Sequence, residues 1–128
     1  MDTNYDDWSD AAVAFEVMCR HLNPIEKKIE KGVAMYRTHE EEKWREFNID
    51  NPAHVWPIML DSGISINHGK KNLNIQDYYE YDPLKDEWVD IWFVGAGIPE
   101  AQGRTIDKSK ILRVVSICFL KLTDATND

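Results

Sequence analysis

The spacing of apolar residues along the chain changes near Gly63. Before Gly63, apolar residues recur every three to four positions, which is typical of amphipathic helices. After Gly63 they alternate with polar residues, which is typical of strands. Helices followed by strands predict an α+β fold. Because 128 residues are a usual length for one domain, we expect a single α+β domain spanning residues 1–128.

Two N-terminal helices are expected. Ser9 can cap the first, which would end near Leu22. Asn23, Pro24 and Glu26 form a capping-box-like start, so residues 24–47 are expected to form a second helix, or two shorter ones with a bend at Gly32. Because Pro57 disfavours the helical conformation at Trp56, residues 50–57 should hold at most one helical turn. The buried face of the first helix is expected to consist of Ala11, Ala12, Phe15, Met18, Cys19 and Leu22.

The two helices are expected to pack on a mostly antiparallel sheet of about four strands. Turn-forming residues at 68–72 predict a hairpin whose second strand continues to Tyr81, and residues 87–94 predict a further strand. Three glycines and Pro99 predict a long connection over residues 95–110. Residues 110–122 would place apolar side chains on both faces of an extended chain, so we interpret them as the central strand of the sheet.

Composition restricts the class of protein. The formal net charge is −8, hydrophobic residues make up 43% and aromatic residues 11%, a mixture too apolar for a disordered chain and too charged for a membrane protein. The acidic N-terminus does not resemble a secretion signal, so we expect a cytoplasmic protein without membrane contact. Cys19 and Cys118 lie in apolar stretches and are expected to be free, buried thiols. The negative charge disfavours direct binding to nucleic acid.

No motif in the chain specifies a chemistry. Residues 94–100 contain two glycines of a dinucleotide-binding loop but have Glu100 where the third is required. His39 begins a zinc-protease-like pattern, but Lys43 stands where the second histidine is required. We therefore predict no catalytic residue, no metal ligand and no cofactor, and an enzyme is not the favoured interpretation.

Residues 77–92 are the most unusual part of the sequence. They contain six carboxylates against Lys85, and they alternate these with five tyrosines and tryptophans. Negative charge beside stiff aromatic rings suits recognition of a basic protein surface, although aromatic residues also favour strands for structural reasons. The predicted binding residues are Tyr78, Tyr79, Glu80, Tyr81, Asp82, Asp86, Glu87, Trp88 and Asp90.

The sequence favours a small acidic binding protein. It would act as an inhibitor, of the immunity or anti-defence type, of a basic partner such as a nuclease or a nucleic-acid-binding complex. One alternative is an α+β-barrel enzyme or ligand-binding protein, and another is a structural subunit of a larger assembly. The pocket of the barrel alternative would be lined by Tyr36, His54, Trp56, Asp61 and Trp92.

Overall fold

The structure is a computed structural model that describes residues 4–72 and 87–126. The α+β class is confirmed. The described strands form two antiparallel three-stranded sheets, β1-β2-β3 and β4-β5-β6, instead of one sheet of about four strands. The elements in chain order are η1 (Tyr5–Asp7), α1 (Asp10–Leu22), β1 (Glu26–Glu30), β2 (Val33–Arg37), β3 (Arg45–Phe47), α2 (Pro52–Ser62), β4 (Ser65–Asn72), β5 (Trp88–Gly95), β6 (Gln102–Thr105), η4 (Lys108–Lys110) and α3 (Ile111–Thr126).

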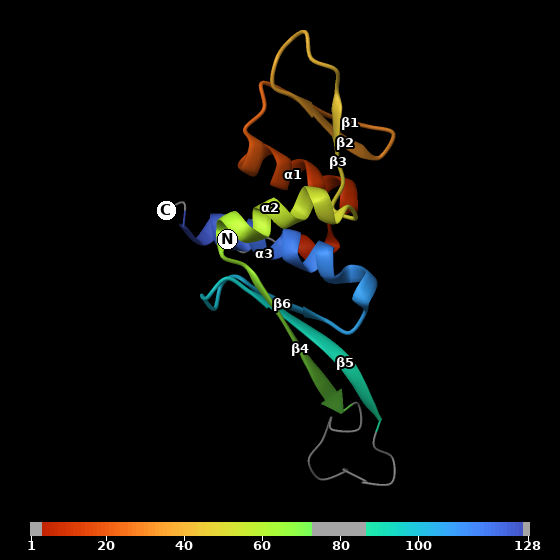
Figure 1. Cartoon of the computed structure of the whole chain (residues 1–128), viewed down its shortest axis with the longest axis vertical. Helices are drawn as coiled ribbons and strands as arrows, with labels where there is room; N and C mark the ends of the chain where they lie inside the picture. Colours follow the sequence, from red (N-terminus) through yellow and green to blue (C-terminus); the bar gives the residue numbers. More distant parts are fainter. Residues whose placement is uncertain (1–3, 73–86, 127–128) are drawn as a thin grey trace.

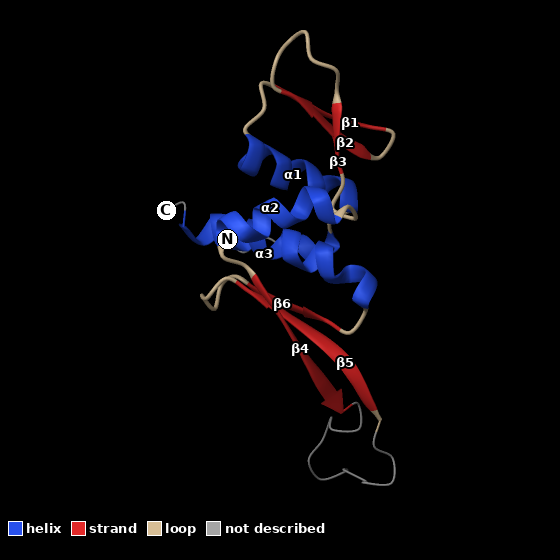
Figure 2. Cartoon of the chain, viewed as in Figure 1, coloured by secondary structure: helices blue, strands red, loops and turns tan. Residues whose placement is uncertain are grey.

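The three α-helices lie between the two sheets (Figure 1). Helix α1 packs against the β1-β2-β3 sheet and against α3, while α3 also packs against α2, β5 and β6. Figure 2 shows the sheets at opposite ends of this helical layer. The most deeply buried side chains come from the helices and include Val13, Val17, Met18, Ile58, Val115 and Leu120. The core is therefore helical, and each sheet covers one side of it.

The prediction for α1 is confirmed in its position, but of its predicted buried face only Met18 is fully buried. Ser9 caps the helix by accepting a hydrogen bond from the Ala12 amide at 3.1 Å. The buried side chains are Val13, Ala14, Val17 and Met18, whereas Phe15 and Cys19 are only half-buried. Helix α1 lies between a sheet and α3, so it is buried on two sides. A prediction from one apolar stripe assumes burial on one side only.

The second predicted helix is wrong, because residues 24–47 contain the strands β1, β2 and β3 and the turns between them. Lys31 and Gly32 connect β1 to β2 and have φ angles of 53° and 76°. A two-residue hairpin turn with positive φ at both positions matches the twist of paired strands. Asn23, with φ 45°, ends α1 in the left-handed conformation instead of starting a helix. Gly32 thus marks a turn and is not a weak point within a helix.

Residues 52–62 form α2, where the sequence predicted at most one turn. Asn51 caps the helix by accepting a hydrogen bond from the Ala53 amide at 2.9 Å, and Pro52 occupies its first turn. Pro57 has no backbone N–H, so the carbonyl of Ala53 lacks its usual helical hydrogen bond. Ala53 is exposed, so water can bind this carbonyl instead. Burial of Val55 and Ile58, which are 1% and 0% exposed, outweighs that loss.

The predicted central strand at residues 110–122 is also wrong, because the segment forms η4 and then α3. All six residues from Val115 to Leu120 are buried. A helix enclosed on most sides carries apolar residues around its whole circumference, and this pattern also resembles a strand covered on both faces. None of the described helices, α3 included, has the length and apolar character needed to cross a lipid bilayer.

The two remaining strand predictions need smaller corrections. Residues 68–72, predicted as a turn, continue β4, and the residues that follow Asn72 up to Asp86 lie outside the described residues. The predicted long connection contains the short strand β6, which pairs with β5. The strand predicted at residues 87–94 is confirmed as β5.

Both cysteines are free, as predicted. Cys118 is 1% exposed, and burial raises the pKa of its thiol to about 11. Cys19 is half-buried, and burial also raises the pKa of its thiol. Both groups are therefore protonated near neutral pH, and Cys118 acts as a core residue that also donates to the Ala101 carbonyl at 3.3 Å.

Helix α3 lies close to β6 at Gly103. A Cβ atom added there would lie 2.6 Å from Cγ1 of Val114, a stiff β-branched side chain. We expect Gly103→Ala to lower the free energy of unfolding by about 1–3 kcal/mol through overpacking, measured by urea denaturation. Adding Val114→Ala to that variant should recover part of the loss.

Gly95→Ala is the control for this prediction. Gly95 lies in neighbouring β5, and an added Cβ there would come no closer than 3.8 Å to its nearest neighbour. Equal destabilisation by Gly103→Ala and Gly95→Ala would contradict the tight contact between α3 and β6.

Candidate functional site

Strands β4 and β5 form an arm that projects away from the helices (Figure 1). We define the arm as residues 65–72 and 88–95, which pair along their whole length from Ser65 with Gly95 to Asn72 with Trp88. Strand β6 pairs only with residues 92–95 of β5. Among residues 4–72 and 87–126, the outer half of the arm is thus formed by two strands.

One face of the arm carries an ordered group of aromatic and charged side chains. The register places His68 opposite Trp92 and Lys70 opposite Asp90, and strand alternation puts Trp88 on the same face. Nearer the helices, Gly103 on this same face contacts α3. The side of the arm that carries these residues is therefore continuous with the side of the sheet that α3 covers. We define the arm face as His68, Lys70, Trp88, Asp90 and Trp92.

Asp90 organises the charges of the arm face. One of its carboxylate oxygens, Oδ1, accepts a hydrogen bond from Lys70 Nζ at 2.5 Å and lies 2.8 Å from His68 Nε2. Hydrogen bonds from Lys70 and then His68 lower the pKa of the Asp90 carboxyl group, so Asp90 remains ionised at neutral pH. The His68 ring also stacks on Trp92, with ring centroids 5.3 Å apart.

Trp88 lies at the outer end of the described part of β5 and is 57% exposed. Tryptophan is enriched among the residues that dominate binding energy at protein interfaces, because it buries a large apolar area with few rotatable bonds. The arm face therefore suits recognition of another macromolecule. Within residues 4–72 and 87–126, no three His, Cys, Asp or Glu side chains lie close enough together to hold a metal ion.

The predicted binding residues are only partly within the described chain. Trp88 and Asp90 lie on the arm face, and Glu87 is exposed directly before β5. Tyr78, Tyr79, Glu80, Tyr81, Asp82 and Asp86 lie outside the described residues.

Sequence reasoning missed His68 and Lys70, because it assigned both to a turn. One feature of the sequence does indicate a strand here. His68, Lys70 and Asn72 occupy every second position, as Trp88, Asp90 and Trp92 do, and residues at every second position share one face of a strand.

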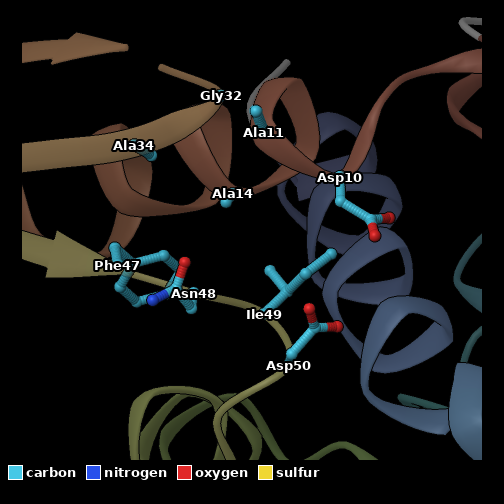
Figure 3. A pocket seen from close by; sticks show the side chains of 9 residues that line it. All are labelled: Asp10, Ala11, Ala14, Gly32, Ala34, Phe47, Asn48, Ile49 and Asp50. Carbon is cyan, nitrogen blue, oxygen red and sulfur yellow. The ribbon is translucent and has the colours of Figure 1, made fainter. Parts of the chain in front are cut away.

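A small hollow lies where the first turn of α1 meets the β1–β2 turn and the β3–α2 connection (Figure 3). Its volume is about 80 Å³, whereas pockets for cofactors and drug-sized ligands usually measure about 300–1,000 Å³. Of its two carboxylates, Asp10 is paired with Arg113 at 2.6 Å. The hollow can admit a few water molecules but not a nucleotide or a sugar. It is lined by Asp10, Ala11, Ala14, Gly32, Ala34, Phe47, Asn48, Ile49 and Asp50.

The residues proposed for the barrel alternative are spread over separate elements. Tyr36 belongs to β2 and Trp92 to β5, in sheets at opposite ends of the helical layer (Figure 2). His54 accepts a hydrogen bond from the Asn48 amide at 3.0 Å and stacks on Phe47, so it holds the connection between β3 and α2. Trp56 is 55% exposed on α2. The described strands do not form the curved single sheet that this alternative requires.

Comparisons with known proteins gave no match. Neither the protein-family models, nor the curated proteins, nor the solved structures contain one that matches this chain. The structure describes an α+β protein with two sheets around a helical core and a projecting β-arm.

Proposed function

We propose that this chain is a protein-binding module that recognises a basic protein surface through its arm. The contact would consist of the arm face together with the acidic and aromatic residues that connect β4 to β5. In the cell, the chain would act as an inhibitor of that partner, with a nuclease or a nucleic-acid-binding complex as the class of partner that its charge fits best.

The exposed Trp88 at the outer end of the arm is the observation that carries this proposal. Covering the exposed Trp88 ring with a partner would remove additional apolar area from water. Asp90, which binds Lys70 and His68, lies two residues from Trp88 on the same face of β5. An aromatic anchor bordered by charged groups is the usual composition of an interface centre and its rim.

Charge supports a basic partner. Residues 73–86 contain four carboxylates, at Asp77, Glu80, Asp82 and Asp86, against Lys85. Within the arm, Lys70 is paired with Asp90 and Lys71 is exposed, while Glu87 is exposed directly before β5. The net negative charge is therefore concentrated where the chain connects the two strands. Such a charge would steer a basic protein towards the arm and accelerate association.

The experiment is capture from native cells followed by measurement of binding rates. The immobilised full chain should retain a stoichiometric basic protein that mass spectrometry identifies. Trp88→Ala should then weaken binding of that purified partner by about 30-fold or more, mainly through faster dissociation. Reversal of Glu80, Asp82 and Glu87 to Lys should slow association and reduce its dependence on salt.

Phe93→Ala is the control, because Phe93 lies on the same strand with its 45% exposed ring on the opposite face of the arm. This variant should bind within about threefold of the unmodified chain. Capture of no stoichiometric partner, an acidic partner, or equal losses for Trp88→Ala and Phe93→Ala would each refute recognition by the arm face. Thermal unfolding of each variant identifies any loss that is caused by misfolding.

A further inference from the structure

Helix α2 carries apolar residues on its solvent side as well as on its buried side. Val55 and Ile58 are buried, and α3 is the main neighbour of this helix among the described elements. On the outer side, Ala53, Trp56, Pro57 and Leu60 are all exposed, with 55% of Trp56 and 62% of Leu60 accessible to solvent. We call these four residues the α2 stripe.

The spacing of the α2 stripe makes it a continuous surface. The four residues share one side of a helix, because they follow one another at steps of three, one and three positions, at 53, 56, 57 and 60. They extend over about two turns, or about 10 Å at 1.5 Å per residue. A surface helix normally has polar residues on its solvent side. The α2 stripe is thus an unpartnered apolar face and not a single exposed side chain.

The acidic and basic residues of α2 and of the segments that flank it in sequence have one sign. Residues 46–69 contain no lysine and no arginine, whereas Asp50 precedes the helix and Asp61 lies in its last turn. Both carboxylates are exposed. Asp61 lies at the negative end of the helix dipole, where an acidic side chain is unfavourable for the helix itself. Negative charge at both ends of an apolar stripe complements an apolar surface that is bordered by basic residues.

We infer that α2 is a second docking surface, separate from the arm, and that it binds a basic amphipathic helix of a partner protein. Apolar residues of the partner helix would cover Trp56 and Leu60, and its lysines or arginines would lie near Asp50 and Asp61. Two turns of exposed helix match the short apolar contact that an amphipathic helix makes. This surface goes beyond the proposed function, because it does not involve any residue of the arm.

Charge disfavours the other occupants of the stripe. A second copy of the chain placed on the same face would bring Asp50 and Asp61 of both copies together, with no lysine or arginine within residues 46–69 to offset them. Each copy also carries a formal net charge of −8. An anionic lipid surface would be repelled for the same reason. A basic helix is the occupant for which both the apolar area and the charge are favourable.

The experiment uses two synthetic helical peptides and the full chain. One is an 18-residue peptide with leucines on one face and lysines elsewhere, and the other has glutamate in place of every lysine. The lysine peptide should bind, and it should shift the amide NMR signals of α2 residues. The glutamate peptide should show no binding at a tenfold higher concentration. Asp50→Asn combined with Asp61→Asn should weaken binding of the lysine peptide by about threefold or more and reduce its dependence on salt.

The stripe itself is tested by Trp56→Ala combined with Leu60→Ala, which should weaken binding of the lysine peptide at least tenfold. The matched control is Ile25→Ala, since Ile25 is 61% exposed but lies before β1. This control should bind within about twofold of the unmodified chain. Loss of peptide binding in Trp88→Ala, without loss in the Trp56→Ala, Leu60→Ala variant, would place the peptide on the arm and would overturn this inference. Circular dichroism and thermal unfolding show whether each variant folds.

Four further outcomes would overturn the inference. The first is unchanged binding by the Trp56→Ala, Leu60→Ala variant, and the second is equal binding of the glutamate peptide. The third is dimerisation of the unmodified chain, measured by analytical ultracentrifugation, that is lost in the same double variant. The fourth is binding to phosphatidylcholine or phosphatidylserine vesicles that depends on Trp56 and Leu60, because the stripe would then serve a lipid surface.

Discussion

Replacement of Leu120 by alanine should lower the free energy of unfolding by about 2–5 kcal/mol, which is a large part of the stability of a small domain. Leu120 is 0% exposed and lies in α3, the helix that contacts α1, α2, β5 and β6. Truncation removes three carbon atoms from a site where neighbours press from several sides, so the structure cannot easily close the cavity. Urea denaturation of the purified chain measures the loss.

Leu60→Ala is the matched control for this prediction, because the same substitution is made in a helix at a residue that is 62% exposed. It should change the free energy of unfolding by no more than about 0.5 kcal/mol. Hydrogen exchange should also find the amides of residues 115–120 among the slowest in the described chain. Similar losses for Leu120→Ala and Leu60→Ala would contradict the position of α3 at the centre of the fold.

The parts of the fold that were predictable from sequence are those where local chemistry and burial agree. Ser9 caps α1 both in the prediction and in the structure, because a serine before an apolar helical pattern can accept a hydrogen bond from a free amide of the first turn. Strand β5 was predictable because its aromatic and β-branched residues favour an extended chain. The α+β class follows from the presence of both patterns.

The errors arose where tertiary contacts outweigh local preference. Residues 25–36 show a helical spacing of apolar residues, but Lys31 and Gly32 adopt a turn that requires positive φ, and the chain reverses there. Ile25 and Ile29, which a helix would have buried, are exposed. For α3, the length of the segment favours a helix, since the thirteen residues from 110 to 122 exceed the usual length of a strand, which is about five or six residues.

The candidate site was predictable in composition but not in geometry. The sequence identified Trp88 and Asp90, because carboxylates and aromatic rings are concentrated around them. It could not identify the partners of Asp90, since the pairing of Lys70 and His68 with that carboxylate depends on the register between strands that are distant in sequence. The sequence does not predict the α2 stripe, because Pro57 disfavours the helix on which the stripe lies.

Arg113 should be the most important charged residue for stability in the described chain. Its guanidinium group donates hydrogen bonds to the Asp10 carboxylate at 2.6 Å and to the Trp8 carbonyl at 2.5 Å. It also donates to the carbonyls of Asp6 and Tyr5, at 3.2 and 3.4 Å. The Arg113 side chain is only 16% exposed. One side chain of α3 therefore holds the whole segment that leads from η1 into α1.

We expect Arg113→Met to lower the free energy of unfolding by roughly 2–3 kcal/mol, because methionine keeps most of the buried stem but leaves several carbonyls without their charged donor. Asp10→Asn is the control, since it weakens the ion pair while Arg113 keeps its bonds to the carbonyls. Because the Asp10 side chain is 60% exposed, this change should cost at most about 1 kcal/mol. In Arg113→Met, but not in Asp10→Asn, the amides of residues 5–8 should exchange faster with solvent. Equal losses for the two variants would mean that the ion pair, and not the set of carbonyl contacts, attaches the N-terminal segment to α3.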